Sequence, residues 1–232
     1  MNWEEILQCT RVIASYLLPT LKVFGFTLIF SIPLGMIVAL LKMHGFKPLR
    51  WLLNVYILIM RGTPLMLQII TIYYAIPMMK VSDSGFFQKL FANVDTRSDN
   101  YLFTALITAF ALNYAAYFAE IFRGGIESIP KGQYEAAAAL GMTKIQTFFR
   151  VILPQVIKRI VPASSNEIIT LVKDTSLASV IAYAEIFRKA REQMVTYSSL
   201  IPLFVAGVFY FVMNALLTML FSAVEKKLNY YR

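Results

Sequence analysis

The chain has 232 residues, of which 58% are hydrophobic and 15% are charged, and its formal net charge is +9. A water-soluble domain of this length carries fewer apolar residues, so the composition predicts a membrane protein and excludes a cytosolic enzyme. The basic residues are spread over several loops, which favours contact with anionic lipid over binding of nucleic acid. The single cysteine, Cys9, allows no internal disulfide and no cysteine metal site.

Several apolar stretches reach the length of about 20 residues that crosses the hydrocarbon of a bilayer. After an amphipathic lead-in at residues 1–16, we expect five spans, at about 17–41, 51–78, 101–122, 156–183 and 199–224. Arg61-Gly62-Thr63-Pro64 interrupts the second span. That span is therefore either one kinked helix or an interfacial helix over 51–60 followed by a crossing that starts near Thr63. The expected fold class is an all-α membrane protein with a single domain over residues 1–232.

The segment 123–155, between the third and fourth spans, is too polar to lie in a bilayer and reads as two short helices. Ser128 and Pro130 indicate a helix start, the alanines at 136–139 continue that helix, and Gly141 ends it. Thr143 and Gln146 form a capping-box pattern for the second helix. That second helix is expected to carry one apolar stripe, made of Ile145, Phe148, Phe149 and Ile152.

This segment resembles the EAA loop of ABC importer permeases, a cytoplasmic coupling helix that sits in a groove of an ATPase. The matching residues are Glu135-Ala136-Ala137, Gly141, Val151, Leu153 and Pro154, and the family often has Ile at the position of Val151. Two further segments are similar to the amino-acid branch of that family: Arg61-Gly62-Thr63-Pro64-Leu65 and Lys173-Asp174-Thr175-Ser176-Leu177. The resemblance implies an ATPase-coupling surface made of Tyr134, Glu135, Ala136, Ala137, Leu140 and Gly141.

The chain has no GxxxxGK[ST] motif to cradle ATP phosphates, and it has no HExxH, GxSxG or His/Cys cluster. We therefore expect no enzymatic activity, catalytic residue, metal ligand or cofactor in this chain. The resemblance implies that a pair of separate ABC ATPase subunits binds ATP and Mg. It also implies a second permease chain, identical or a close paralogue, and an extracellular or periplasmic amino-acid-binding protein.

The resemblance places the central loop in the cytoplasm, so the N-terminus is expected outside the cell membrane and the C-terminus in the cytoplasm. In that orientation the inner segments 42–50, 123–159 and 225–232 hold 12 Lys and Arg residues. The outer segments 1–22, 79–99 and 184–199 hold eight. The positive-inside rule agrees with this orientation by a narrow margin.

Polar side chains within a span are costly unless they face a cavity or a partner. Glu167, Thr170 and Asp174 share one helix face, and Glu167 lies about 16 Å along its span, near the bilayer midplane. Interhelical hydrogen bonding is the alternative role for Gln68, and pairing with neighbouring groups near the outer surface is the alternative for Asp174. The candidate substrate-binding residues are Glu167, Asn113, Asp174, Asn166, Arg61 and Gln68.

A carboxylate at this depth favours a cation, either the ammonium of any amino acid or a basic side chain. Related permeases for neutral, glutamine-like substrates often have a neutral residue at the position of Glu167, so the resemblance favours cationic amino acids. The sequence therefore predicts the membrane-spanning permease subunit of an ATP-driven importer of polar, cationic amino acids. One alternative is the same importer class for neutral or other polar amino acids. The other is a self-contained secondary transporter or channel for small polar solutes.

Overall fold

The structure is a computed structural model, which describes residues 1–81 and 85–228. Within those residues every regular element is a helix. The α-helices are α1 (Trp3–Ala14), α2 (Leu17–His44), α3 (Lys47–Gly62), α4 (Leu65–Val81), α5 (Gly85–Leu90), α6 (Asp99–Glu127), α7 (Lys131–Ala139), α8 (Lys144–Thr147), α9 (Leu153–Asp174), α10 (Ile186–Thr196) and α11 (Ile201–Leu228). A π-helix, η1 (Phe148–Ile152), precedes α9, and a 3₁₀ helix, η2 (Thr175–Ile181), follows it. Residues 82–84 of the expected outer loop and 229–232 of the tail lie outside the described residues.

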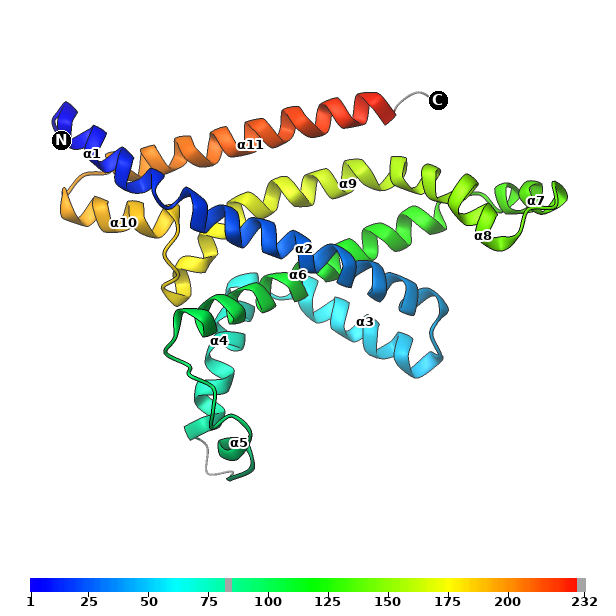
Figure 1. Cartoon of the computed structure of the whole chain (residues 1–232), viewed down its shortest axis with the longest axis horizontal. Coiled ribbons are helices and arrows are strands. Elements are labelled where there is room, and N and C mark those ends of the chain that lie inside the picture. The colour runs from blue at the N-terminus through cyan, green and yellow to red at the C-terminus, as the bar shows by residue number, and fades with distance from the viewer. Residues whose placement is uncertain (82–84, 229–232) are drawn as a thin grey trace.

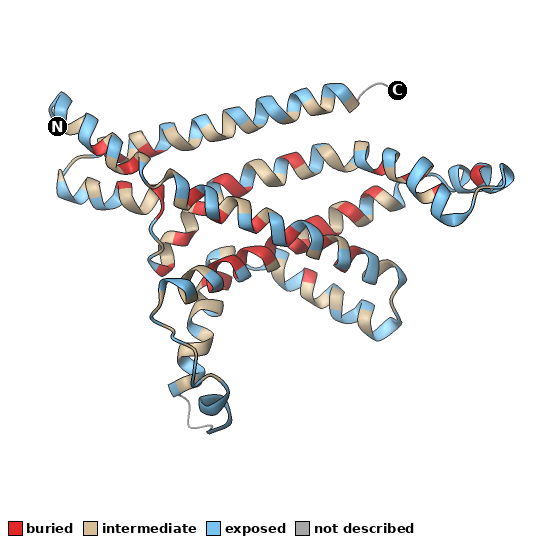
Figure 2. Cartoon of the chain, in the orientation of Figure 1, coloured by how far each residue is buried: buried red, intermediate tan, exposed pale blue. Residues whose placement is uncertain are grey.

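The long helices α2, α6, α9 and α11 lie along the longest axis of the molecule (Figure 1). The short helices α7 and α8 lie at one end, and α4 and α5 project to one side. The buried residues gather on α6 and the helices that pack against it, as Figure 2 shows in red. The chain is thus a helical bundle with one element, α6, at its centre.

The α2 and α6 backbones approach closely because α2 carries a glycine at their crossing. A Cβ atom placed on Gly35 would lie 2.7 Å from Cβ of Phe118 and 3.0 Å from the carbonyl oxygen of Ala115. Further along the same pair, Nζ of Lys42 lies 2.6 Å from Oε1 of Glu120. A close backbone contact and an ion pair therefore hold α2 against α6.

The expected second span, 51–78, is divided into two helices, α3 and α4, whose axes are bent by 112°. The bend falls at Thr63 and Pro64, between the two helices. Proline lacks a backbone N–H and disfavours a helical conformation in the residue before it, and Thr63 is extended with φ −120° and ψ 149°. The interruption predicted from the sequence is therefore a complete break.

Three helical segments in the described part of the chain are long and apolar enough to cross a membrane: Trp3–His44, Asp99–Glu127 and Ile201–Leu228. The bent pair of α3 and α4 makes a fourth if it is counted as one span. These segments, with the absence of strands in the described residues, confirm the predicted class of all-α membrane protein.

The helix type changes within the expected fourth span, 156–183. Its α-helix, α9, ends at Asp174 and is not among the apolar segments. The hydroxyl groups of Thr175 and Ser176 donate hydrogen bonds of 2.7 Å to the carbonyls of Val172 and Lys173. Such side-chain bonds compete with the α-helical pattern, and the chain continues as the 3₁₀ helix η2.

The first short helix of the central segment starts later than predicted. Pro130 occupies the N-cap position of α7, whereas Ser128 is the C-cap residue of α6 and donates its hydroxyl to the carbonyl of Gly125. The predicted helix end is confirmed: Gly141 has a φ of 73°, in the left-handed region that favours glycine.

The second short helix begins where the sequence predicts, but its later turn is not α-helical. The capping box of Thr143 and Gln146 is present. Phe148–Ile152 form the π-helix η1, whose wider turn departs from the 3.6-residue period on which the predicted stripe rests. The four residues do not form one buried stripe, because Ile145 and Phe149 are 72% and 61% exposed whereas Ile152 is fully buried.

A buried carboxylate closes the turn between η2 and α10. Glu185 is fully buried and accepts hydrogen bonds of 2.6 Å from the backbone N–H groups of Phe187 and Arg188. It also accepts a 2.8 Å hydrogen bond from the hydroxyl of Tyr210 on α11. Burial raises the pKa of the Glu185 carboxyl, and these hydrogen bonds oppose that shift. Glu185 therefore caps α10 and ties it to α11.

Candidate functional site

A cavity of about 450 Å³ opens where the break between α3 and α4 meets α6 and α9. Four parts of the chain supply its walls: the break, α6, α9 and η2. The lining residues are Thr63, Pro64, Leu65, Asn113, Tyr114, Tyr117, Glu167, Thr170, Asp174 and Leu177. Segments far apart in the sequence thus form one polar pocket inside the bundle.

Two carboxylates reach this cavity from α9. Glu167 and Asp174 lie seven residues apart with Thr170 between them, a spacing that places all three on one helix face. The hydroxyl of Tyr114 donates a 2.7 Å hydrogen bond to Oδ2 of Asp174. This bond fixes the Asp174 carboxylate against α6. The α9 wall therefore offers two acidic groups to whatever enters the cavity.

A cation lies beside the cavity on the end of α3. The guanidinium carbon of Arg61 is 5.2 Å from the ring centroid of Tyr117, within the range of a cation–π contact. Arg61 is exposed, is not a lining residue, and interacts electrostatically with Glu167. The ring of Tyr117, which lines the cavity together with Glu167, thus has a basic side chain over its face.

Amide side chains hold the break in place. Nε2 of Gln68 donates hydrogen bonds to Oγ1 of Thr63 at 2.8 Å and to the carbonyl oxygen of Met60 at 3.0 Å. Nδ2 of Asn113 donates to Oε1 of Gln68 at 2.9 Å and to the same Met60 carbonyl at 2.8 Å. At the break, backbone carbonyl groups near the end of α3 have no intrahelical partner, and these hydrogen bonds satisfy them. The same bonds join α3, α4 and α6.

The structure brings some of the predicted site residues together and separates others. Glu167, Asn113 and Asp174 line the cavity. Gln68 is buried behind Asn113, and Arg61 lies beside Tyr117. Asn166 is exposed on α9 and does not line the cavity.

Two lining residues on α6 were missed as site residues. Tyr114 and Tyr117 follow Asn113 by one and four positions, so they lie on neighbouring faces of the same helix. Both are tyrosines inside an apolar helix, which is the signal that could have found them. What the sequence does not show is that Tyr114 reaches Asp174, 60 positions away.

The residues of the expected coupling surface lie on α7 and the turn after it. All of them are exposed except Ala137, which is buried. Leu140 is 81% exposed and Tyr134 is 39% exposed. An apolar and aromatic surface at the end of the molecule is thus available for contact with another protein.

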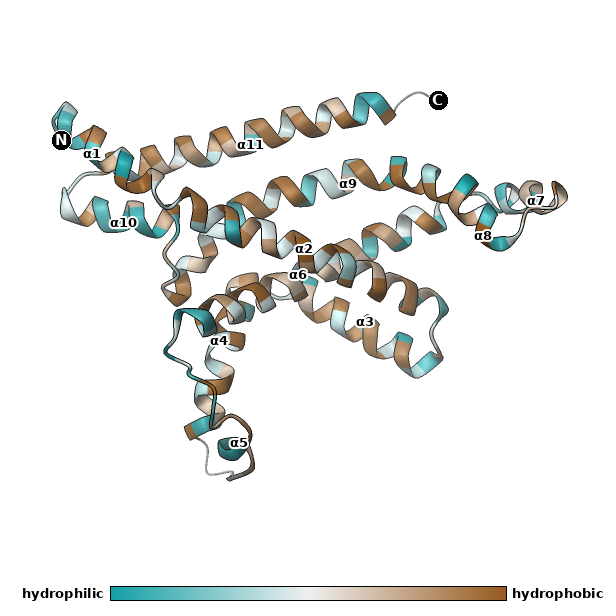
Figure 3. Ribbon diagram, in the orientation of Figure 1, coloured by the Kyte–Doolittle hydropathy of each residue, from teal (hydrophilic) through white to brown (hydrophobic). Residues whose placement is uncertain are grey.

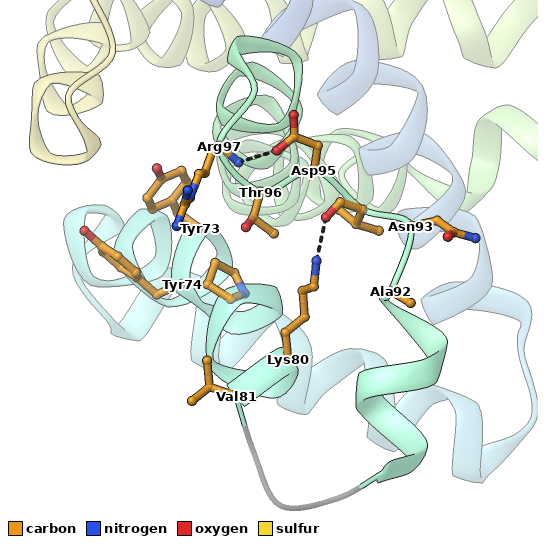
Figure 4. Close-up of a pocket in the computed structure, with 11 residues that line it drawn as sticks. Tyr73, Tyr74, Lys80, Val81, Ala92, Asn93, Asp95, Thr96 and Arg97 are labelled. Carbon is orange, nitrogen blue, oxygen red and sulfur yellow. Dashed lines mark hydrogen bonds between the residues drawn. The ribbon is translucent and has the colours of Figure 1, made fainter.

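A larger cavity, of about 700 Å³, lies between the end of α4 and residues 92–97 (Figure 4). Lys80 points into it, and its Nζ donates a 2.9 Å hydrogen bond to the carbonyl oxygen of Val94. Tyr73, Tyr74 and Arg97 complete its polar lining together with Asp95, Thr96 and Asn93. None of the predicted site residues is among its lining residues.

Among the described residues, no group of three or more His, Cys, Asp or Glu side chains is arranged so that it could hold a metal ion. The two carboxylates of the α9 wall have Tyr114, Tyr117 and Thr170 as polar neighbours in the cavity.

Comparison with known proteins agrees with this architecture. The L-cystine transport system permease protein TcyB of Bacillus subtilis is 37% identical, over 99% of this chain and 92% of the relative. The arginine transport system permease protein ArtQ of the same organism is 38% identical, over 90% of this chain and 89% of the relative. A crystal structure of an amino acid ABC transporter with histidines matches with a TM-score of 0.80 and 34% identity, covering 98% of this chain and 99% of that one. The family model for binding-protein-dependent transport system inner membrane components matches residues 31–230, and the chain belongs to that family.

Proposed function

We propose that this permease carries polar amino acids, in particular those with a cationic side chain, through the 450 Å³ cavity at the break between α3 and α4. The cavity lies within the range of about 300–1,000 Å³ that is usual for small-molecule sites. In this proposal the cavity is the substrate site of an ATP-driven importer, and ATP is hydrolysed by a separate subunit.

The pair of carboxylates on α9 is the observation that carries the proposal. Glu167 and Asp174 face one cavity, and Tyr114 holds Asp174 in place with a 2.7 Å hydrogen bond. A cation in the cavity is attracted by both acidic groups and by the aromatic face of Tyr117. Because helices line the site on several sides, these attractions are stronger than they are in bulk water.

The opposite wall suits the carboxylate of the substrate. α4 begins at Leu65, which lines the cavity directly after Pro64. The first turn of a helix leaves backbone N–H groups without intrahelical partners and carries the positive end of the helix dipole. Broken helices in transporters bind anionic groups in this way. The two walls therefore offer opposite charges to the two charged groups that every α-amino acid carries.

In this proposal, the energy of ATP hydrolysis reaches the permease through α7 and α8. The exposed surface around Leu140, Tyr134 and Gly141 docks on one of a pair of ABC ATPase subunits, which bind ATP and Mg. A second permease chain completes the pathway, and an extracellular or periplasmic binding protein delivers the amino acid. With α7 and α8 in the cytoplasm, the N-terminus lies outside the cell membrane and the C-terminus inside.

Neutral or other polar amino acids are the alternative substrates. The two curated relatives are named for L-cystine and for arginine, whose side chains differ in charge. A self-contained transporter is less well supported, because it leaves the exposed α7–α8 surface without a partner. The choice between cationic and neutral substrates is open to direct measurement.

The test is uptake by the complete importer in proteoliposomes, with a panel of radiolabelled arginine, lysine, histidine, glutamine and cystine. Glu167→Gln removes one negative charge and keeps the shape of the side chain. We expect uptake of the cationic amino acids to fall at least about tenfold relative to glutamine, which corresponds to about 1.4 kcal/mol of lost interaction. Glu4→Gln makes the same chemical change at an exposed position on α1 and should leave the profile unchanged.

Two results would count against the proposal. An unchanged uptake profile in an assembled Glu167→Gln complex removes Glu167 from the site. Uptake that continues without the ATPase subunits and without ATP favours the self-contained transporter.

A further inference from the structure

The cavity of about 700 Å³ between the end of α4 and residues 92–97 shares no lining residue with the 450 Å³ cavity. Two basic side chains line it: Lys80 reaches it from α4 and Arg97 from the loop (Figure 4). The acidic lining residue is Asp95, whose Oδ1 accepts a 3.0 Å hydrogen bond from the backbone N–H of Arg97. The described lining therefore carries an excess of positive charge.

This cavity lies at the membrane surface. Residues 92–97 lead to Ser98, the N-cap residue of α6, and α6 is one of the segments that are apolar enough to cross a membrane. The loop therefore lies where α6 enters the bilayer, at the opposite end of α6 from α7 and α8 (Figure 1). In Figure 3 the trace that leads into α6 is teal, whereas α11 is mostly brown along its length.

Three tyrosines beside the cavity indicate its depth. Tyr73 and Tyr74 line it, and their ring centroids are 4.9 Å apart. The hydroxyl of Tyr101, in the first turn of α6, donates a 2.5 Å hydrogen bond to the carbonyl oxygen of Tyr73. Tyrosine is enriched at the level of the lipid headgroups, where its ring meets hydrocarbon and its hydroxyl meets water. The cavity is thus placed at the depth of the headgroups.

Apolar side chains are exposed next to the cavity. Met78 and Val81 at the end of α4 are exposed, as are Phe86 and Leu90 on α5, which packs against α4. Val81 also lines the cavity, so the exposed apolar residues continue to its edge. Exposed apolar side chains beside a basic polar site are typical of a segment that lies in the membrane interface.

We propose that this cavity binds the headgroup of an anionic phospholipid from the leaflet opposite α7 and α8. The guanidinium of Arg97 suits two phosphate oxygens at once. The ammonium of Lys80 has three donors, of which one is used in the 2.9 Å hydrogen bond to the carbonyl oxygen of Val94. Asn93 and Thr96 line the same cavity and can bind hydroxyl groups of the headgroup.

The charge of the lining selects among phospholipids. A zwitterionic headgroup brings its own ammonium close to Lys80 and Arg97, whereas an anionic headgroup brings the phosphate charge alone. Each basic residue near a membrane surface adds to the attraction of anionic lipid. The acyl chains of the bound lipid lie against the exposed apolar residues of α4 and α5.

Photo-cross-linking tests the proposal. The complete importer is reconstituted in phosphatidylcholine bilayers that contain a trace of phosphatidylglycerol with a diazirine on its headgroup. After illumination, mass spectrometry of the digested protein locates the attached lipid. We expect labelling of the end of α4 and residues 92–97, and at least about fivefold less labelling there by the matching phosphatidylcholine probe. Unlabelled phosphatidylglycerol added to the bilayer should displace the label.

Paired variants separate this site from general attraction to the membrane. Lys80→Gln combined with Arg97→Gln should lower the labelling at least about tenfold. Lys80→Arg combined with Arg97→Lys keeps both charges and should retain most of it. Arg11→Gln combined with Lys22→Gln removes the same two kinds of charge at exposed positions on α1 and α2 and should leave the labelling unchanged. Subunit composition and uptake are measured for each complex.

Three results would overturn the proposal. One is equal labelling of the Lys80→Gln, Arg97→Gln complex and the wild-type complex. Another is loss of the label with soluble glycerol phosphate as readily as with phosphatidylglycerol, since the cavity then takes phosphate from solution. The third is unchanged lipid labelling with uptake lost only when the binding protein delivers the substrate, which assigns the two cations to a protein partner. The substrate site at Glu167 is tested separately, by the uptake profile.

Discussion

Nδ2 of Asn113 on α6 donates a 2.9 Å hydrogen bond to Oε1 of Gln68 on α4, directly behind the candidate cavity. Gln68 in turn donates to Thr63 and to the carbonyl of Met60 at the end of α3. One amide side chain therefore connects the three helices that meet at the break. Gln68, one of the candidate substrate-binding residues, thus makes the interhelical hydrogen bonds that the sequence analysis gives as its alternative role.

Replacing Gln68 should loosen the break. Gln68→Met has a similar shape but no hydrogen-bonding groups, so Met60 and Thr63 lose a donor. We expect a loss of about 1–3 kcal/mol in the free energy of unfolding, the cost of unpaired buried polar groups. The midpoint of thermal unfolding in detergent reports this loss of stability. If the thermal unfolding midpoint of Gln68→Met equals that of the wild-type protein, the remaining contacts between α3, α4 and α6 are enough to hold the break.

Gly35 should be intolerant of any side chain. In Gly35→Ala the new Cβ lies 2.7 Å from Cβ of Phe118, so α2 and α6 must separate. We expect destabilisation of about 1–3 kcal/mol, as is usual for overpacking. Gly25→Ala is the matched control in the same helix, because nothing lies within 4 Å of its Cβ position. The control should stabilise by up to about 1 kcal/mol, since alanine favours helix. Equal unfolding midpoints for the two variants would contradict the close crossing.

A charge at the end of α7 should weaken the contact through which the permease and the ATPase subunits communicate. Gly141 has a φ of 73°, which asparagine and aspartate tolerate better than other residues. Gly141→Asp adds a negative charge to the exposed surface, whereas Gly141→Asn has the same shape without charge. We expect uptake and substrate-stimulated ATPase activity to fall at least about tenfold in Gly141→Asp, and to fall much less in Gly141→Asn.

Both activities are measured on purified complexes whose subunit composition is checked first. Normal uptake and normal stimulated ATPase activity in an assembled Gly141→Asp complex would show that this surface does not transmit the signal.

The hydrogen bond between Tyr210 and Glu185 should contribute to the stability of the fold and not to the choice of substrate. Tyr210→Phe removes the 2.8 Å hydrogen bond to a fully buried carboxylate. Hydrogen bonds to charged groups contribute about 1.5–3 kcal/mol, so we expect a lower unfolding temperature with an unchanged ranking of amino acids in uptake. Tyr74→Phe makes the same chemical change at a 44% exposed tyrosine and should have little effect on stability. A changed substrate ranking in Tyr210→Phe would give Glu185 a part in selectivity.

Features that depend on neighbouring residues could be predicted from the sequence. The capping box of Thr143 and Gln146, the end of α7 at Gly141 and the interruption before Pro64 each follow from backbone chemistry within a few residues. The placement of Glu167 and Asp174 on one helix face is of the same kind, because it follows from the periodicity of α9. The apolar stretches likewise determined the class of all-α membrane protein.

Only the tertiary structure decided which of these residues meet. Asn113 and Gln68 are 45 positions apart, and Tyr114 and Asp174 are 60 apart, so no local pattern links them. The π-helix after Thr147 and the change from α-helix to 3₁₀ helix at Thr175 were also not predicted, because the periodicity of the sequence does not show where the hydrogen bonding between helical turns changes. Periodicity reports the interactions along one helix, whereas contacts between helices depend on how the whole bundle packs.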